Sequence, residues 1–261
     1  MSETNTKLRP AAPRKRVTKA QKRRILRRRK VGMAAACLGF VLICVFWQAN
    51  HPVTSGQLER FGWRQTLSFG ELSHLNHLLR KYEITSPASL TMFFATAGAE
   101  TDNGRLVLEE GGDAYYEKHG YSADERGAGY LQMTHREEQL AFLRAIGDDF
   151  AGEDTASYIA ETYPWESACW EWSVGKTVPA PNPNAYARRE GNRLEIFLAT
   201  QYAINGWVID DAALSDIVCG ADYTVTSDGK TVTVGGASFR MPRGWPDRAE
   251  RYEAAKAIWG E

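Results

Sequence analysis

Three glutamates lie close together in a stretch that joins an apolar segment to a pair of glycines. The stretch is "AETDNGRLVLEEGG" at positions 99–112, and it contains Glu100, Glu109 and Glu110. Hydrolysis of a glycosidic bond needs two carboxyl groups, one kept protonated by apolar surroundings and one ionised to activate water or attack the sugar. Glu100 follows the apolar residues Phe93 and Phe94, whereas Glu109 lies in a polar stretch, so their surroundings suit these two roles. Most glutamate clusters are solvated surface, however, and spacing alone is a weak indication of catalysis.

Other chemistries find little support in the sequence. The histidines are dispersed, and only His74 and His77 lie close together, without the HExxH motif of zinc hydrolases. Neither a glycine-rich dinucleotide-binding motif nor a P-loop is present. A reaction carried by two carboxyl groups needs no metal ion or organic cofactor, and we expect none.

Two helices must lead into the carboxylate stretch. Leucines at helical spacing predict an amphipathic helix within 67–84, and Ser68 or Ser73 could cap its start. Pro87 suits the first turn of a second, buried helix that ends near Glu100. The glycine-rich segment that follows, up to Gly129, predicts mostly loop.

Helices are also predicted further along the chain. Thr134 as N-cap and Glu137 three residues later form a capping box, and Gly147 can end that helix. Segments 154–164, 165–174 and 191–205 also read as helices, while the proline-rich segment 177–190 predicts irregular structure. Two Thr- and Val-rich runs around Asp228 and Gly229 predict a β-hairpin. The fold class is therefore mainly α (α+β) with a small late hairpin.

The first thirty residues differ sharply from the rest of the chain. They carry 13 Lys or Arg against one acid, Glu3, whereas residues 31–261 carry 19 Lys or Arg against 31 Asp or Glu. The uncharged run 31–47 follows and is just long enough to span a bilayer. We expect a basic cytoplasmic tail at 1–30, a transmembrane signal anchor at 31–48, a linker at 49–60 and an extracellular domain at 61–261. A cleaved signal peptide is the alternative, but no small-residue cleavage site follows the run.

The basic tail and the cysteines leave other interpretations open. Clustered cations attract nucleic acid or anionic lipid, but the topology signal requires neither, so no nucleic-acid partner is expected. Cys169 and Cys219, both in the expected extracellular part, could form a disulfide or remain free thiols.

Several separated stretches together resemble glycoside hydrolase family 19, the chitinase family with a lysozyme-like fold. "FGW" and the segment ending in Glu100 and Thr101 are similar to that family's opening helices. "RGAGYLQMTHR" at 126–136 resembles the segment that lines the family's cleft, and "PWESACWEWS", "AING" and "DRAERY" follow in the family's order. The resemblance covers about residues 61–252.

The resemblance implies roles for particular residues. Glu100 would be the general acid, Glu109 the general base and Thr134 the hydroxyl that positions water. The family inverts anomeric configuration, which requires carboxyl groups ~6.5–9.5 Å apart. Residues expected to contact sugar or support the acids are Tyr130, Gln132, Asn205 and Arg248, and Tyr115 is a further candidate for glycan contact from its glycine-flanked loop.

The sequence also departs from the family pattern. Ala99 replaces the usual His before the acid, Ala128 replaces an Arg between two glycines, and about forty residues from Trp207 to Trp245 look inserted. A one-residue shift would exchange Glu109 with Glu110. The expected activity is chitinase-like hydrolysis of β-1,4-linked N-acetylglucosamine polymers by a membrane-anchored extracellular enzyme. Peptidoglycan hydrolysis, glycan binding without turnover, and a structural role in a surface assembly remain alternatives, and the oligomeric state is open.

Overall fold

The computed structural model describes residues 19, 27, 30–41, 50–174, 182–205 and 209–260. The chain divides into two units, residues 1–49 and 50–261. In the first unit, residues 30–41 are helical, and residues 42–48 of the expected anchor lie outside the described residues. Among the described residues, no helix combines the length and the apolar character that crossing a membrane requires.

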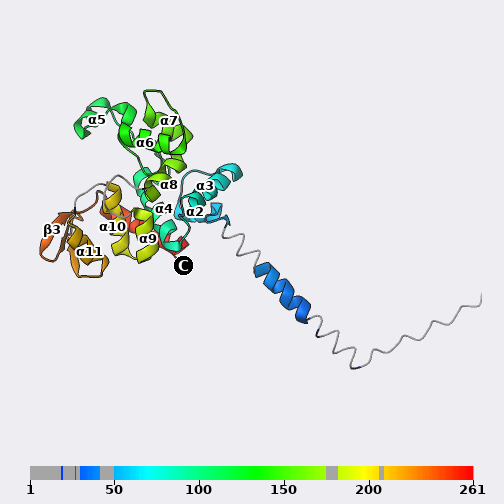
Figure 1. Ribbon diagram of the computed structural model, residues 1–261. Coiled ribbons are helices and arrows are strands. Elements are labelled where there is room, and N and C mark those ends of the chain that lie inside the picture. Colours follow the sequence, from blue (N-terminus) through cyan, green and yellow to red (C-terminus); the bar gives the residue numbers. More distant parts are fainter. Residues whose placement is uncertain are drawn as a thin grey trace, which may run out of the picture. The chain divides into compact units, whose positions relative to one another are not determined.

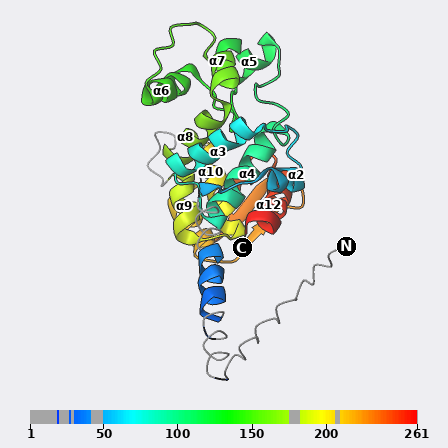
Figure 2. The ribbon, with the colours of Figure 1, turned by 90° about the vertical axis from the view of Figure 1, so that its right-hand side faces the viewer.

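The second unit is mainly helical, and its elements in chain order are drawn in Figures 1 and 2. The helices are α2 (Ser55–Phe61), α3 (Phe69–Lys81), α4 (Pro87–Thr101), α5 (Asp113–His119), the 3-10 helix η1 (Ala123–Glu125), α6 (Arg136–Ile146), α7 (Thr155–Thr162), α8 (Pro164–Val174), α9 (Pro183–Glu190), α10 (Leu194–Asn205), α11 (Asp211–Val218) and α12 (Trp245–Trp259). The strands β1 (Tyr223–Val225), β2 (Thr231–Val234) and β3 (Ala237–Arg240) form an antiparallel sheet in that order.

Helix α4 forms the centre of the larger hydrophobic core. The Ser86 side chain accepts a hydrogen bond from the amide of Ser89 and so caps the helix, and Pro87 occupies the first turn as the sequence predicted. Its apolar side chains are buried by helices on several sides: Trp259 of α12, for example, stacks on Phe94 with ring centroids 4.5 Å apart. A helix this enclosed gives its last turn, which carries Glu100, a rigid base.

A second, smaller hydrophobic cluster lies under α6 and α7 and includes Met133, Phe142 and Ile159. Together with α5, these helices form an upper lobe that stands apart from the α9, α10 and sheet region in both ribbon views (Figures 1 and 2). Helix α8 joins the two clusters, because Trp172 is buried in the larger one while Trp170 packs against the smaller. The two lobes are therefore linked through α8.

Three predicted segments differ in the structure. Residues 113–119 form α5 in the segment expected to be mostly loop. Residues 183–190, expected to be irregular, form α9, because the Asn182 side chain caps the helix and Pro183 fits its first turn. The expected linker contains α2, whose Leu58 is buried, and Val53 before it is buried as well. The folded unit therefore begins near Asn50 rather than at residue 61.

The predicted capping box at Thr134 is wrong. Helix α6 begins at Arg136 after His135, whose φ is 75°, and the helix has no side-chain cap from Thr134. The amide of Arg136 instead donates to the carboxylate of Glu125 at 3.0 Å, so a distant acid caps this helix. The Thr134 hydroxyl donates to the carbonyl of Gln132 at 2.9 Å and is not used as a cap.

Candidate active site

Glu100 lies in the last turn of α4 and is held by an arginine from the last helix. The Nη2 atom of Arg248 lies 2.8 Å from Oε1 of Glu100, and the two side chains are 7% and 19% exposed. The Nη1 atom of Arg248 donates to Gln201 of α10 at 2.8 Å, and its Nε donates to the carbonyl of Arg243 at 2.7 Å. Three hydrogen bonds therefore fix the Arg248 guanidinium, which links α10 and α12 to Glu100 of α4.

The apolar surroundings expected for Glu100 are not what the structure shows. Phe93 and Phe94 are fully buried one to two turns earlier in α4, but the Glu100 carboxylate itself faces a guanidinium. A positive partner stabilises a carboxylate, whereas apolar surroundings would favour the neutral acid. The prediction from local sequence assigned to Glu100 the environment of the residues before it, whereas the resemblance had named Arg248, 148 positions away, among the residues that contact sugar or support the acids.

A short network of backbone hydrogen bonds connects the end of α4 with the Glu109 segment. The amide of Leu106 donates to the carbonyl of Thr101 at 2.9 Å, and the amide of Gly129 donates to the carbonyl of Val107 at 2.8 Å. The amide of Glu109 then donates to the carbonyl of Gly127 at 2.8 Å. Glu109 is thus placed against the 126–136 segment.

The Glu109 carboxylate accepts hydrogen bonds on both of its oxygens. The hydroxyl of Tyr121 lies 2.9 Å from Oε1 and 3.1 Å from Oε2, and the hydroxyl of Tyr115 lies 3.2 Å from Oε1. The amide of Gly127 donates to Oε2 at 2.9 Å. The side chain is half-buried, whereas the neighbouring Glu110 is exposed and forms no hydrogen bond within the described part of the chain. Of the two adjacent acids, only Glu109 is oriented by its surroundings.

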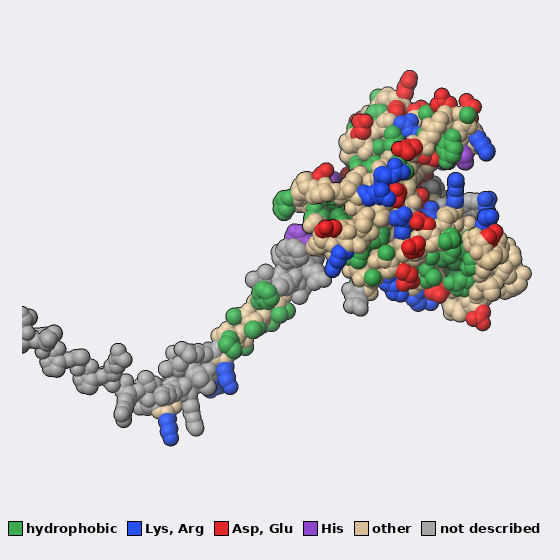
Figure 3. All heavy atoms as spheres, turned by 180° about the vertical axis from the view of Figure 1, so that it is seen from behind, with side chains coloured by type: hydrophobic (Ala, Val, Ile, Leu, Met, Phe, Trp, Pro, Cys, Tyr) green, Lys and Arg blue, Asp and Glu red, His purple; other side chains and the backbone are tan. Residues whose placement is uncertain are grey.

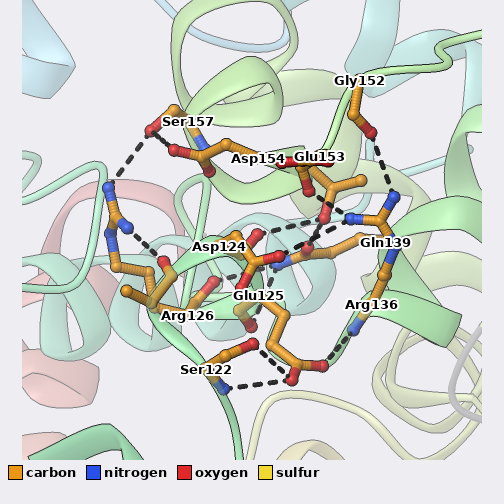
Figure 4. Close-up of polar contacts among 12 residues, drawn as sticks. Ser122, Asp124, Glu125, Arg126, Arg136, Gln139, Gly152, Glu153, Asp154 and Ser157 are labelled. Carbon is orange, nitrogen blue, oxygen red and sulfur yellow. Dashed lines mark hydrogen bonds and ion pairs between the residues drawn. The ribbon is translucent and has the colours of Figure 1, made fainter. Parts of the chain in front are cut away.

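The turn between Tyr121 and Gly127 is anchored by a polar network shown in Figure 4. Glu125 accepts hydrogen bonds from the amide and hydroxyl of Ser122 at 3.0 and 2.8 Å as well as from Arg136. The buried amide group of Gln139 donates to the carbonyls of Arg126 and Met133 at 2.9 and 3.0 Å. Because Tyr121 and Gly127 flank this turn, the network fixes two of the three donors to Glu109.

Glycine at 127 permits the close approach of two predicted site residues. A Cβ atom at Gly127 would lie 2.9 Å from Oε1 of Gln132 and 3.3 Å from Oε2 of Glu109. The Nε2 atom of Gln132 donates to the carbonyls of Gly129 and Leu106 at 2.9 and 3.2 Å. Its side chain therefore bridges the 126–136 segment and the loop that carries Glu109. Thr134 lies two residues beyond Gln132 on the same segment and is half-buried.

The structure places the remaining predicted residues differently. Tyr130 is 3% exposed, and its hydroxyl donates to Gln65 at 2.6 Å, so it neither supports a predicted acid nor faces open solvent. Tyr115 contacts Glu109, which was not foreseen for it, and its ring lies 4.3 Å from that of His119. Asn205 ends α10, and its side chain lies outside the described part of the structure.

Tyr121 and Gln201 were not predicted from the sequence, although both take part in positioning the carboxylates. Tyr121 follows Gly120, which ends α5 with a φ of 84°, and no local pattern marks it as a partner of Glu109. Gln201 lies on the apolar helix α10 and is fully buried, and its amide donates to the hydroxyl of Thr96 at 2.9 Å. A buried glutamine within an apolar helix was the available signal, since such a group requires partners.

Neither a metal centre nor a disulfide is present in the described residues. Within them, no three His, Cys, Asp or Glu side chains are grouped so as to hold a metal ion. Cys169 is a fully buried free thiol, and burial raises its pKa, while Cys219 is a free, exposed thiol. The alternative of a disulfide between them does not hold in this structure.

Comparisons with known proteins show which solved structures have a similar fold. No protein-family profile and no curated protein sequence matches the chain. Among solved structures, chitinase C from Streptomyces griseus HUT6037 is similar with a TM-score of 0.53 and 19% identity, covering 81% of this chain and 94% of that chain. A mutant of chitinase C is similar with the same TM-score and coverage at 18% identity. The chain therefore has a chitinase-like fold, and the resemblance to glycoside hydrolase family 19 found in the sequence is confirmed at the level of the fold.

Proposed function

We propose that the protein is an inverting glycoside hydrolase that cleaves β-1,4-linked N-acetylglucosamine polymers. Glu100 protonates the oxygen of the leaving sugar, and Glu109 activates a water molecule on the opposite face of the ring. The hydroxyl of Thr134 positions that water. The observation that carries the proposal is the Glu109 carboxylate, which Tyr115, Tyr121 and Gly127 orient within a chitinase-like fold.

The contacts of Glu109 suit a residue that activates water. A general base must present one carboxylate oxygen to the attacking water in a fixed direction. The hydroxyls of Tyr115 and Tyr121 and the amide of Gly127 donate hydrogen bonds to the two carboxylate oxygens of Glu109. These contacts fix the orientation of the carboxylate. Thr134 is free of the capping role predicted for it, and its hydroxyl oxygen retains acceptor capacity for a water molecule.

The ion pair between Glu100 and Arg248 sets a condition on the acid role. The acid role requires the Glu100 carboxyl group to reach the oxygen of the leaving sugar, and its Oε1 atom is engaged by Arg248 at 2.8 Å. The same ion pair also favours a second candidate function, glycan binding without turnover, because a permanently paired Glu100 donates no proton.

The proposed location is the outer face of a cell membrane. The basic tail before the apolar run at 31–47 supports an anchor with a cytoplasmic N-terminus. A surface-anchored enzyme meets the cell wall first, so peptidoglycan is the rival substrate to chitin. Both polymers contain β-1,4-linked amino sugars, and the two carboxylates would act in the same way on either.

The test is release of reducing ends from chitooligosaccharides and from purified peptidoglycan. The variants are Glu100→Gln and Glu109→Gln, with Glu110→Gln as the matched control next to Glu109. We expect activity of the wild type on at least one polymer, activity near background for the first two variants, and activity of the control close to wild type. Binding of either polymer by the wild type without release of reducing ends would favour the glycan-binding function. Loss of activity in Glu110→Gln rather than in Glu109→Gln would assign the role of base to Glu110.

A further inference from the structure

A cavity of about 340 Å³ lies between α3 and the junction of α7 with α8, outside the candidate active site. Its lining includes Glu71 and His74 of α3, and Glu161 and Trp165 at the α7–α8 junction, but neither Glu100 nor Glu109. In the space-filling view from behind, acidic and basic side chains are interspersed between the upper lobe and the rest of the molecule (Figure 3). The volume is within the range of small-molecule sites, about 300–1,000 Å³.

The inner part of the cavity is aromatic and rigid. Tyr130 and Trp165 both line it, and their ring centroids are 4.0 Å apart. The Tyr130 hydroxyl donates to Gln65 at 2.6 Å, and the Gln65 amide donates to the carbonyl of Gly104 at 2.7 Å. Burial, followed by the charge of Glu71, raises the pKa of Tyr130 to about 12, so its phenol stays neutral. This floor is preformed and uncharged.

The rim of the cavity is acidic. Glu166 is paired with Lys81 at 2.6 Å, and Glu71 accepts a hydrogen bond from the amide of Ser68 at 2.7 Å. Glu161 forms no hydrogen bond or ion pair within the described part of the chain. His74 is the one basic side chain among the lining residues. Because Lys81 balances the charge of Glu166, the two remaining negative charges at the rim are those of Glu71 and Glu161.

We propose that this cavity binds a glucosamine unit whose 2-amino group is free, as a second site for partly deacetylated amino-sugar polymer. The ammonium group binds at the rim between the Glu71 and Glu161 carboxylates, where it gains charge-assisted hydrogen bonds, and the sugar ring contacts the aromatic floor. The neutral acetamido group of N-acetylglucosamine gives neither carboxylate a charged partner. The sugar class rests on the proposed function, whereas the preference for an ammonium group rests on the cavity alone.

The site differs from the proposed catalytic cleft in what it recognises. Catalysis requires Glu100 and Glu109, and the cavity shares with the predicted site only Tyr130. The backbone of Tyr130 also belongs to the 126–136 segment, and its amide donates to the carbonyl of Pro164 at 3.1 Å. An occupied cavity therefore borders the segment that carries Gln132 and Thr134.

The experiment is a titration of the full-length Glu100→Gln protein followed by backbone amide NMR and calorimetry. The probes are the β-1,4-linked glucosamine tetrasaccharide and its fully N-acetylated counterpart, and the Glu100→Gln background prevents cleavage. We expect the glucosamine probe to shift the amides of residues 71–74, 161–163 and 165, and the acetylated probe to leave them unchanged. Failure of hydrolysis in the assay above would leave this expectation intact, because the cavity does not contain the catalytic acids.

The matched variants are Glu161→Gln in the cavity and Glu253→Gln on the exposed face of α12, which remove the same charge. We expect Glu161→Gln to weaken binding of the glucosamine probe about tenfold, since one charge-assisted hydrogen bond is lost, and Glu253→Gln to have no effect. Equal binding of both probes at these amides, shifts confined to the Glu109 loop, or unchanged affinity in Glu161→Gln would each overturn the proposal.

Discussion

The hydroxyl of Tyr121 contacts both oxygens of the Glu109 carboxylate, at 2.9 and 3.1 Å. The two residues are twelve positions apart and are brought together by α5 and by the network around Glu125. A glutamate on a glycine-flanked loop would otherwise sample many orientations. The contact converts it into an oriented group, and this orientation underlies the proposed role of Glu109 as the base.

Removal of the Tyr121 hydroxyl tests that orientation. We expect Tyr121→Phe to lower kcat by roughly 10- to 100-fold, because a hydrogen bond to a charged group contributes about 1.5–3 kcal/mol. Tyr116→Phe is the control, since the hydroxyl of Tyr116 donates to the backbone carbonyl of Glu109 at 3.1 Å and not to the carboxylate. Steady-state kinetics on a chitooligosaccharide measures both, and equal loss in the two variants would contradict a specific role for Tyr121.

A methyl group at Gly127 tests the close approach of Glu109 and Gln132. The new Cβ would lie 2.9 Å from Gln132 and 3.3 Å from Glu109, so both side chains must move. We expect Gly127→Ala to lower activity about tenfold, because Oε1 of Gln132 must move aside and the Glu109 carboxylate must shift by a few tenths of an ångström. Gly112→Ala, at the N-cap of α5, where a Cβ meets nothing within 4 Å, should retain activity. Full activity of Gly127→Ala would show that this geometry is not needed.

Loss of Arg248 should destabilise the fold as well as the site. Arg248→Met removes the guanidinium that contacts both the Glu100 carboxylate and Gln201, and we expect the free energy of unfolding to fall by about 3 kcal/mol. The comparison is Arg105→Met, whose ion pair with Asp102 at 3.0 Å is solvent-exposed and contributes at most about 1 kcal/mol. Urea denaturation measures both variants. A similar decrease in the free energy of unfolding in both variants would show that burial of the Arg248–Glu100 pair adds no stability.

Acid should weaken the turn that carries Tyr121 and Gly127. The hydrogen bonds from the amide of Arg136 and from Ser122 hold the pKa of Glu125 below its ordinary value of 4.5. A lowered folded-state pKa contributes stability above the unfolded value that is lost as the pH falls through the folded value. The Tm of wild type should exceed that of Glu125→Gln at about pH 7, and the difference should shrink as the pH falls below 4.5 and vanish once the pH is below the lowered folded-state pKa. A difference that does not change with pH would contradict this.

The sequence predicted the elements whose signals are local. Ser68 and Pro87 mark the starts of α3 and α4, and the hairpin signal at Asp228 and Gly229 corresponds to β1 and β2. Helix α9 was missed although Asn182 and Pro183 are favourable starting residues, because the prolines and asparagines before it dominated the interpretation. Local sequence patterns therefore predicted an element correctly where a segment carried one kind of signal, and failed at α9, where helix-starting and irregular-structure signals overlap.

The candidate site could be predicted only in part. The resemblance to a family pointed to Glu100, Glu109 and Arg248, and the structure shows which groups hold them. Local sequence patterns did not predict the long-range contacts: only the resemblance indicated that Arg248, 148 positions from Glu100, supports the acids, and nothing indicated that Glu125 caps α6 from 11 positions away. These pairings depend on how α4, α10 and α12 pack, and no local pattern encodes that packing.

The most direct test of the central claim is the anomeric form of the first product. Proton NMR recorded early in the cleavage of a β-1,4-linked N-acetylglucosamine hexamer separates the two anomers before they equilibrate. With Glu100 as acid and Glu109 activating water, the new reducing ends should appear as the α-anomer. Initial release of the β-anomer would contradict the account, because it requires a nucleophile where we place a water molecule.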